Sequence, residues 1–215
     1  MKLSSLVLSF ALFSQIASAG VLSLEHGSKS IEGVNVASSA TLSLTGATEA
    51  TKLDSVGAGL RQKKVLVANV KVYVAQIFVD NAGKFVRTEA GAMASLKEMK
   101  AAAVNLTFLR SVDAPTVQVS FRDAFDANDV DLNNKGVAAF LSAVKESADA
   151  KEGKSMKMSM KKDNGVVTLV FEGTNGVEKT ITGDEKLFNA ILSIWLGESA
   201  DAGLEVLKAS ILKGE

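Results

Sequence analysis

Residues 57–80 read GAGLRQKKVLVANVKVYVAQIFVD, and this stretch decides the fold. Its side chains alternate with the two-residue period of a β-strand. One face would carry Val70, Val72, Val74, Gln76 and Phe78, and the other would carry Lys71, Tyr73, Ala75, Ile77 and Val79. The pattern predicts a long strand over residues 60–79, at the centre of a sheet.

Arg61 precedes Tyr73 by twelve residues inside this apolar pattern. Polar groups in such surroundings need solvent, a negatively charged guest or a hydrogen-bonding guest. Arginine is scarce among the 24 basic residues, which favours a role for its planar bidentate fork. The pair therefore indicates an anion site. Two simpler interpretations remain open: Arg61 forms an ordinary surface ion pair, or Tyr73 fills core space with its hydroxyl at the rim.

The first nineteen residues have the pattern of a signal peptide. Lys2 precedes an apolar run over residues 3–16, and Ala17-Ser18-Ala19 forms a small-x-small cleavage site. The run is shorter than the ~20 residues needed to span a bilayer, which argues against a signal anchor. We expect export to the periplasm, cleavage after Ala19 and no stable membrane anchor. The chain has no cysteine, so the core rather than disulfides must stabilise it there.

Composition restricts the function classes. Residues 20–215 fit one domain of ordinary size. Basic and acidic residues both number 24 and the basic ones form no block, so no nucleic-acid partner is expected. His26 is the single histidine, and with no cysteine it leaves no metal-ligand cluster and no Ser-His or Cys-His nucleophile. No metal and no cofactor are expected.

The remainder of the chain predicts an α+β domain. A strand is expected at residues 40–44, a helix at 89–100 and another strand at 103–109. Asp113 is a suitable N-cap for a helix with Pro115 in its first turn, and a second helix follows with Val137 and Val144 on its apolar face.

The C-terminal half predicts an antiparallel meander followed by two helices. Asn164-Gly165 and Asn175-Gly176 suit hairpin turns between strands at residues 156–161, 166–171 and 177–182. Asp184 and Ser199 are the expected caps of the two closing helices. The order of elements predicts an antiparallel sheet that carries its helices mainly on one side.

Three segments resemble the chalcone isomerase-like superfamily. They are Gly59-Leu60-Arg61 leading to residues 71–79, Phe108-Leu109-Arg110 with the helix that ends at Asn128, and residues 183–187 leading to Ser193-Ile194-Trp195-Leu196-Gly197. The resemblance spans most of residues 20–215 and identifies the chain as an exported bacterial member. It implies an open-faced β-sandwich, in which a long antiparallel sheet and a helical layer enclose a cleft.

The resemblance also implies which residues line that cleft. Plant enzymes of the family close the chalcone ring with an arginine, a threonine, a tyrosine, an asparagine and a serine or threonine. Arg61 and Asn128 match two of these positions, but Tyr73 replaces the strand threonine, Phe121 replaces the tyrosine, and the last hydroxyl position falls on Phe188 or Asn189. Two hydroxyl donors are therefore missing, and losing one oxyanion donor typically costs about 10²–10³ in rate.

An arginine and a tyrosine facing an apolar cleft resemble the non-catalytic, fatty-acid-binding branch of the superfamily, where the two hold a carboxylate. The leading hypothesis is a periplasmic module that binds fatty acids or similar amphipathic carboxylates. The alternative is an isomerase or intramolecular lyase that acts on a small molecule through Arg61, Tyr73 and Asn128. A third class, a structural or partner-binding protein, would have a closed cleft and no ligand.

Overall fold

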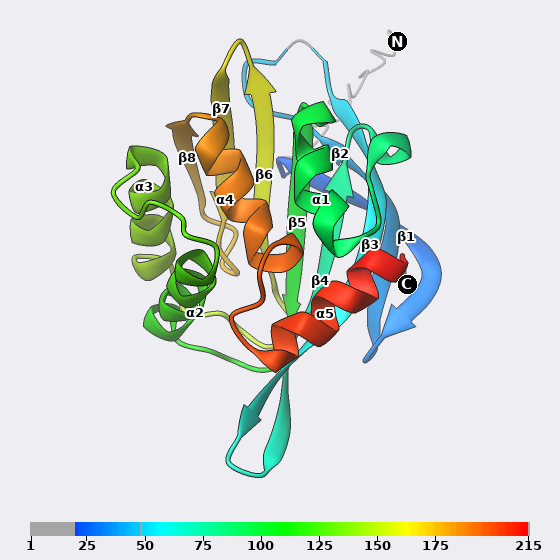
Figure 1. Ribbon diagram of the computed structural model, residues 1–215, viewed down its shortest axis with the longest axis vertical. Coiled ribbons are helices and arrows are strands. Elements are labelled where there is room, and N and C mark those ends of the chain that lie inside the picture. The colour runs from blue at the N-terminus through cyan, green and yellow to red at the C-terminus, as the bar shows by residue number, and fades with distance from the viewer. Residues whose placement is uncertain (1–19, 48, 215) are drawn as a thin grey trace, which may run out of the picture.

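An antiparallel sheet of eight strands organises the chain, whose computed structural model describes residues 20–47 and 49–214. The expected signal peptide lies outside the described residues. Every strand pairs with the next one along the chain, so the sheet is a meander throughout (Figure 1). The strands are β1 (Leu22–Ile31), β2 (Val34–Leu42), β3 (Thr51–Val65), β4 (Ala68–Val79), β5 (Ala101–Phe108), β6 (Ser155–Asp163), β7 (Val166–Glu172) and β8 (Glu178–Gly183).

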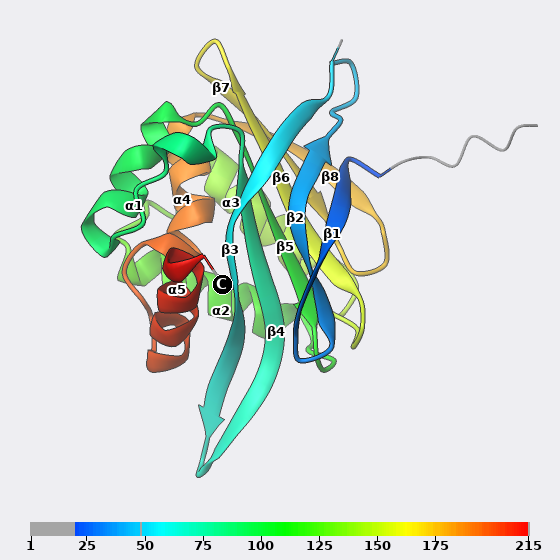
Figure 2. The same ribbon diagram turned by 90° about the vertical axis from the view of Figure 1, so that its right-hand side faces the viewer.

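The helices form a layer on one face of the sheet (Figures 1 and 2). They are α1 (Glu89–Ser95), α2 (Ala114–Ala127), α3 (Lys135–Lys145), α4 (Glu185–Leu196) and α5 (Ala202–Lys213), with 3₁₀ turns η1 (Ala82–Lys84) and η2 (Leu96–Glu98). The main core lies between the two layers, where Tyr73, Ala75 and Ile77 of β4 meet Trp195 of α4 and Leu207 of α5. The α+β class and the open-faced arrangement are confirmed.

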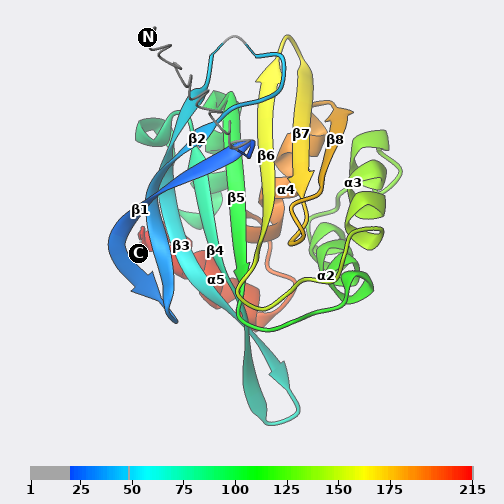
Figure 3. The same cartoon turned by 180° about the vertical axis from the view of Figure 1, so that it is seen from behind.

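A second, smaller core lies on the opposite face. The β1–β2 hairpin curls over the outer side of the sheet, as Figure 3 shows from behind. Leu22 and Leu42 of this hairpin pack with Phe78 of β4 and Val170 of β7. Alternate residues of β4 therefore serve the two cores, Ile77 the first and Phe78 the second, as the two-residue period requires.

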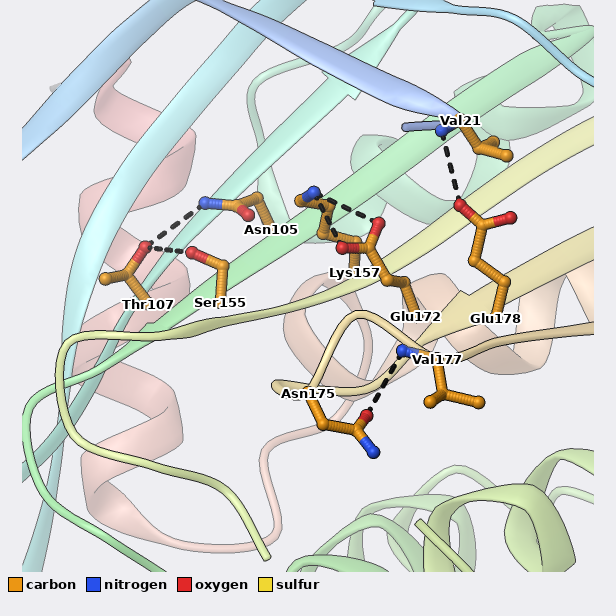
Figure 4. Close-up of polar contacts among 9 residues, drawn as sticks. All are labelled: Val21, Asn105, Thr107, Ser155, Lys157, Glu172, Asn175, Val177 and Glu178. Atoms are coloured by element: carbon orange, nitrogen blue, oxygen red, sulfur yellow. Dashed lines mark hydrogen bonds and ion pairs between the residues drawn. The ribbon is translucent and has the colours of Figure 1, made fainter. Parts of the chain in front are cut away.

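Several polar contacts join residues of the later strands (Figure 4). The Lys157 ammonium lies 3.0 Å from the Glu172 carboxylate across β6 and β7, with both side chains largely buried. The Thr107 hydroxyl lies 3.0 Å from that of Ser155 and accepts from the Asn105 amide at 3.3 Å. A backbone N–H at Val21 donates to the Glu178 carboxylate at 3.4 Å. The last of these contacts ties the start of β1 to β8.

Several expected elements are confirmed. The strand expected at residues 40–44 is part of β2 and ends at Leu42, and the helix expected at residues 89–100 ends at Ser95, where a 3₁₀ turn follows. The Asp113 and Asp184 side chains accept from backbone N–H groups at the starts of α2 and α4. Asn164 and Gly165 both have positive φ, 48° and 80°, as their hairpin turn requires. The single long strand over residues 60–79 is wrong, because the chain reverses at Leu66 and Val67, where Val65 pairs with Ala68. No glycine, asparagine or proline marks that turn, so the alternating pattern concealed it.

Helix α5 lies directly on β3 because glycines remove side chains from the contact. A Cβ on Gly59 would lie 2.7 Å from the Leu207 side chain, and one on Gly57, whose φ is +155°, would collide with the Ile211 carbonyl. At the start of α5, a Cβ on Gly203 would collide with the Gln62 carbonyl. This close approach brings the first turn of α5 to Arg61.

Candidate ligand-binding site

Arg61 and Tyr73 face each other across β3 and β4, at a β-bulge. Arg61 pairs with Tyr73, but the next pair is Gln62 with Lys71, so Val72 is the additional residue. A bulge locally increases twist and re-aims side chains. Arg61 is only 6% exposed and Tyr73 only 8%, which places a guanidinium and a phenol together beneath the helical layer.

A carboxylate of the chain itself occupies the Arg61 fork. Arg61 donates to both Asp201 oxygens, at 2.8 and 2.5 Å, and to the carbonyl of its neighbour Gln62. The Asp201 side chain is 40% exposed, so it lies at the protein surface, whereas the Arg61 guanidinium is buried. The ion pair that the sequence left open therefore exists, but its arginine is buried and its geometry is that of carboxylate recognition.

Asp201 also begins helix α5. Its carboxylate accepts from the Leu204 N–H at 3.0 Å, so it is the N-cap, and the expected cap at Ser199 is wrong. Burial would raise the pKa of Asp201, but hydrogen bonds from Arg61 and from the Leu204 N–H outweigh burial and hold that pKa below its ordinary value. The carboxylate is thus charged at neutral pH and competes with any anionic guest.

Tyr73 carries a hydroxyl that is protonated at neutral pH. Burial raises the pKa of Tyr73, and the nearby Arg61 charge and the hydrogen bond from Trp195 offset only part of that rise. The Trp195 indole N–H donates to the Tyr73 oxygen at 3.2 Å, and the Tyr73 ring packs edge-on against Phe108 with centroids 5.7 Å apart. The phenol oxygen accepts from Trp195 and keeps its own proton to donate.

A small, mostly apolar cavity of about 90 Å³ adjoins this pair. Its apolar lining comprises Val72, Phe108, Val112, Val117, Phe121, Ile194, Ala200 and Leu204, and its polar lining comprises Arg61, Lys63, Tyr73, Ser120, Asp123 and Asp201. Pockets that hold a drug-sized ligand typically measure about 300–1,000 Å³. The cavity is therefore large enough for a head group but too small for a long acyl chain.

Asn128 and Asn189 lie in a different cavity. Both line a space of about 360 Å³ between the end of α2 and the outer side of α4. The Asn128 amide donates to the Ala124 and Glu198 carbonyls at 2.8 and 2.9 Å, and its oxygen accepts from the Glu198 N–H at 2.8 Å. Asn128 thus ties the end of α2 to the loop that leads to Asp201.

The two predicted phenylalanines have separate positions. Phe121 lines the Arg61 cavity and meets the Trp195 ring edge-on, with centroids 5.9 Å apart. Phe188 lines neither cavity; it is fully buried, with the Lys162 ammonium 4.5 Å from its ring centroid. Of the six predicted ligand contacts, the structure groups Arg61, Tyr73 and Phe121 around the cavity and places Asn128, Phe188 and Asn189 elsewhere.

Comparison with known proteins gives the family. The profile described as chalcone isomerase-like matches residues 28–213, nearly all of the described chain. The chain belongs to the chalcone isomerase-like family. The crystal structure of a fatty-acid binding protein from Arabidopsis thaliana superposes on this family member with a TM-score of 0.54 and 17% sequence identity, over 80% of this chain and 95% of that one. Likeness at this identity concerns the fold. No curated protein sequence matches.

Two residues of this chalcone isomerase-like site escaped sequence analysis. For Asp201 a signal was present in the sequence: an aspartate three residues before Leu204 fits the N-cap position of the last helix as well as Ser199 does. Trp195 has no local signal for its hydrogen bond to Tyr73, 122 residues away. Among the described residues, no helix is long and apolar enough to cross a membrane, and no group of three or more potential metal ligands occurs.

Proposed function

We propose that this chalcone isomerase-like protein is an exported, periplasmic binding module for fatty acids or similar amphipathic carboxylates. The observation that carries the proposal is a guanidinium, 6% exposed, that opens onto an apolar cavity and is held bidentately by a carboxylate at the mouth. The chain's own Asp201 occupies the position that a ligand carboxylate would take.

Binding is then an exchange of carboxylates. A fatty acid presents the same two-oxygen fork as Asp201, and the Tyr73 hydroxyl supplies a further donor for it. Each methylene that leaves water adds about 0.8 kcal/mol of favourable free energy, which a short side chain such as Asp201 does not gain. The acyl chain would lie along the apolar lining, between Val117 and Phe121 of α2 and Leu204 of α5.

The exchange requires the cleft to widen. The cavity of about 90 Å³ cannot hold an acyl chain until the start of α5 separates from β3 or from α2. Breaking the Asp201–Arg61 pair releases one of the contacts that hold α5 there. Ligand binding and opening are therefore one event in this proposal. The fatty-acid binding protein with the same fold supports the ligand class, and the pattern of residues 1–19 supports export.

Calorimetry with dodecanoate tests the proposal. Arg61→Ala removes the counter-ion and should weaken binding by about 1.5–3 kcal/mol, the scale of a hydrogen bond to a charged group. Arg122→Ala, which removes an exposed arginine of α2, is the matched control and should bind as the parent does. Dodecanol, which lacks the carboxylate, should not distinguish the variants. Equal dodecanoate affinity in the Arg61 variant and its parent would refute the role of Arg61.

A further inference from the structure

The β3–β4 hairpin ends in an exposed apolar tip. Val65 is 51% exposed, Leu66 91% and Val67 96%, and the last two are the most exposed of the large apolar residues. Single exposed apolar residues are normal on protein surfaces, but three consecutive ones at a tip are a feature that needs a reason. Their exposure costs solubility and contributes nothing to either core.

The tip projects beyond the body of the protein. The last β4–β5 pair is Tyr73 with Phe108, and β2 pairs with β3 only as far as Asp54. Residues 62–71 therefore pair across the hairpin alone. Figures 1–3 show this ribbon extending past the end of the sheet and past the helical layer. The apolar side chains are thus the outermost point of that end of the molecule.

The turn itself departs from local preference. Leu66 has a φ of +54°, a conformation that favours glycine or asparagine in a two-residue hairpin turn. A leucine there is unfavourable both for the backbone and for its exposed side chain. Departures from local rules concentrate where function requires them.

The charged residues of the hairpin itself have one sign. Lys63 and Lys64 precede the tip and Lys71 follows it, whereas no acidic residue occurs from residue 55 to residue 79. Lys71 forms an ion pair with Glu32, at 2.6 Å. Lys63 and Lys64 form no ion pair within the described part of the chain.

We propose that this tip, residues 65–67, inserts into the surface of an anionic lipid bilayer, with Lys63 and Lys64 at the head groups. Apolar side chains at the end of a projection, with lysines just behind them, match the apolar interior and the negative head groups of such a surface. A protein partner is disfavoured because stable interfaces bury about 800 Å² on each side, and a two-stranded tip offers far less. Docking of this kind is reversible and differs from a membrane anchor.

The hairpin also leads to the Arg61 cavity. A groove of about 260 Å³ along its face is lined by Lys63, Val65, Val70 and Arg110, among others. Lys63, Val72, Val112 and Ser120 line both this groove and the Arg61 cavity, so the two are adjacent. An amphipathic carboxylate could thus pass from the bilayer along β3–β4 to Arg61. This path rests on the proposed function, whereas bilayer docking does not.

Vesicle flotation of residues 20–215, which hold every described strand and helix, tests the docking. Vesicles of phosphatidylcholine with an equal part of phosphatidylglycerol, free of fatty acid, should bind the protein, and pure phosphatidylcholine should bind it far less. Leu66→Gly should lower the partition coefficient about tenfold through the lost apolar side chain. The same variant should keep or raise the melting temperature, since glycine adopts the positive φ freely. Leu66→Asn provides a second variant compatible with that conformation.

The role of the lysines is tested separately. Lys63→Gln with Lys64→Gln should weaken vesicle binding about fivefold per lysine, and added salt should weaken binding of the parent likewise. Two control variants show whether such changes are specific to the tip. Lys97→Gln with Lys100→Gln makes the same charge change at the other end of β4 and should have little effect. Val166→Gly removes an exposed apolar side chain from the start of β7 and should also have little effect.

Three results would overturn the proposal. They are no binding to phosphatidylglycerol vesicles, equal binding by the Leu66 variants, and self-association that depends on Leu66 without vesicle binding. Arg61→Ala should bind these vesicles as the parent does. A protein that docks but shows no Arg61-dependent dodecanoate affinity would refute the ligand proposal alone, and the reverse result would refute the docking alone.

Discussion

At the scale of single residues, Arg61 needs a negative partner in every state of the site. Its guanidinium is buried and its charge cannot be removed by titration, so leaving it unpaired would be costly. Asp201 supplies the partner in the closed cleft, and a ligand carboxylate would supply it in the open one. The two carboxylates therefore compete, and weakening one should strengthen the other.

Asp201→Asn tests this competition, because this variant should lower the stability of the fold and yet bind dodecanoate more tightly. The unfolding free energy should fall by about 1–3 kcal/mol, less than the ~3–5 kcal/mol of a fully buried pair because the Asp201 side chain is 40% exposed. Asparagine still caps α5, so the helix should persist. Dodecanoate should bind at least fivefold more tightly, about 1 kcal/mol, because it no longer displaces a charged competitor. Weaker binding in this variant would contradict the exchange.

The same pair predicts a pH dependence of stability. A carboxyl whose pKa is lower in the folded chain stabilises the fold fully above its unfolded pKa, about 3.9. This contribution is lost as the pH falls through the lower, folded pKa of Asp201. Denaturant titrations from neutral pH to acid should therefore show the parent losing more stability than Asp201→Asn, and the two curves should converge in acid.

Tyr73 can be observed alone because it is the only tyrosine of the chain. Because Tyr73 is buried, its phenolate absorbance should rise with a midpoint above the ordinary tyrosine pKa of about 10. The unfolded chain, whose tyrosine should titrate near that ordinary value, is the control. Arg61→Ala should raise the midpoint further, since the Arg61 charge opposes the rise. Bound dodecanoate should also raise it, because its carboxylate would accept a hydrogen bond from the Tyr73 hydroxyl, which favours the neutral phenol. A folded-state midpoint at or below 10 would contradict the buried position of Tyr73.

At the scale of elements, the contact of α5 with β3 decides where Asp201 lies. Gly203 permits it, since a Cβ there would collide with the Gln62 carbonyl and with Arg61. Gly203→Ala should therefore destabilise the fold by about 1–3 kcal/mol through overpacking, although alanine is the better helix former by about 1 kcal/mol. Gly83→Ala, where a Cβ meets nothing within 4 Å, is the control and should be nearly neutral. Thermal or denaturant unfolding of both variants measures the difference.

Sequence patterns predicted elements well where local chemistry and the fold agree. Asp113 and Asp184 begin helices as expected, and Asn164-Gly165 makes its turn, because capping and positive φ are properties of the local chain. The reversal at Leu66 was missed because the turn there opposes local preference. The local pattern at Ser199 and Asp201 suits either residue as a cap, and the attraction of Arg61, 140 residues from Asp201, lies outside any local pattern.

The candidate site shows the same division. Arg61 and Tyr73 could be placed together because scarcity, spacing and family resemblance all pointed to them, and β-pairing does bring them face to face. Asn128 and Asn189 share a second cavity because helix packing, which one sequence does not reveal, turns them away from Arg61. The closed volume of the cleft likewise depends on packing between layers rather than on any motif.

At the scale of the whole molecule, the cleft lies between a continuous sheet and a layer of helices. Of the polar residues in the described lining, only Arg61 and Tyr73 are buried, near the base of the projecting hairpin, and eight of the fourteen lining residues are apolar. Such a site orients an amphipathic guest with its charged head at Arg61. The site offers few hydrogen-bond donors that could promote a reaction elsewhere on the bound molecule.

This distribution of donors predicts that the protein does not cyclise chalcones at a useful rate. Ring closure needs preorganised donors at a developing oxyanion, and each missing donor costs about 10²–10³ in rate. Phe121 brings no hydroxyl to the cavity, and the Asn128 amide is already bonded to Ala124 and Glu198. We expect the absorbance of a hydroxychalcone to decay equally with the parent, with Arg61→Ala and with buffer. Decay that is faster with the parent and depends on Arg61 would instead favour the isomerase, because it would mean that the opened cleft brings further donors to the substrate.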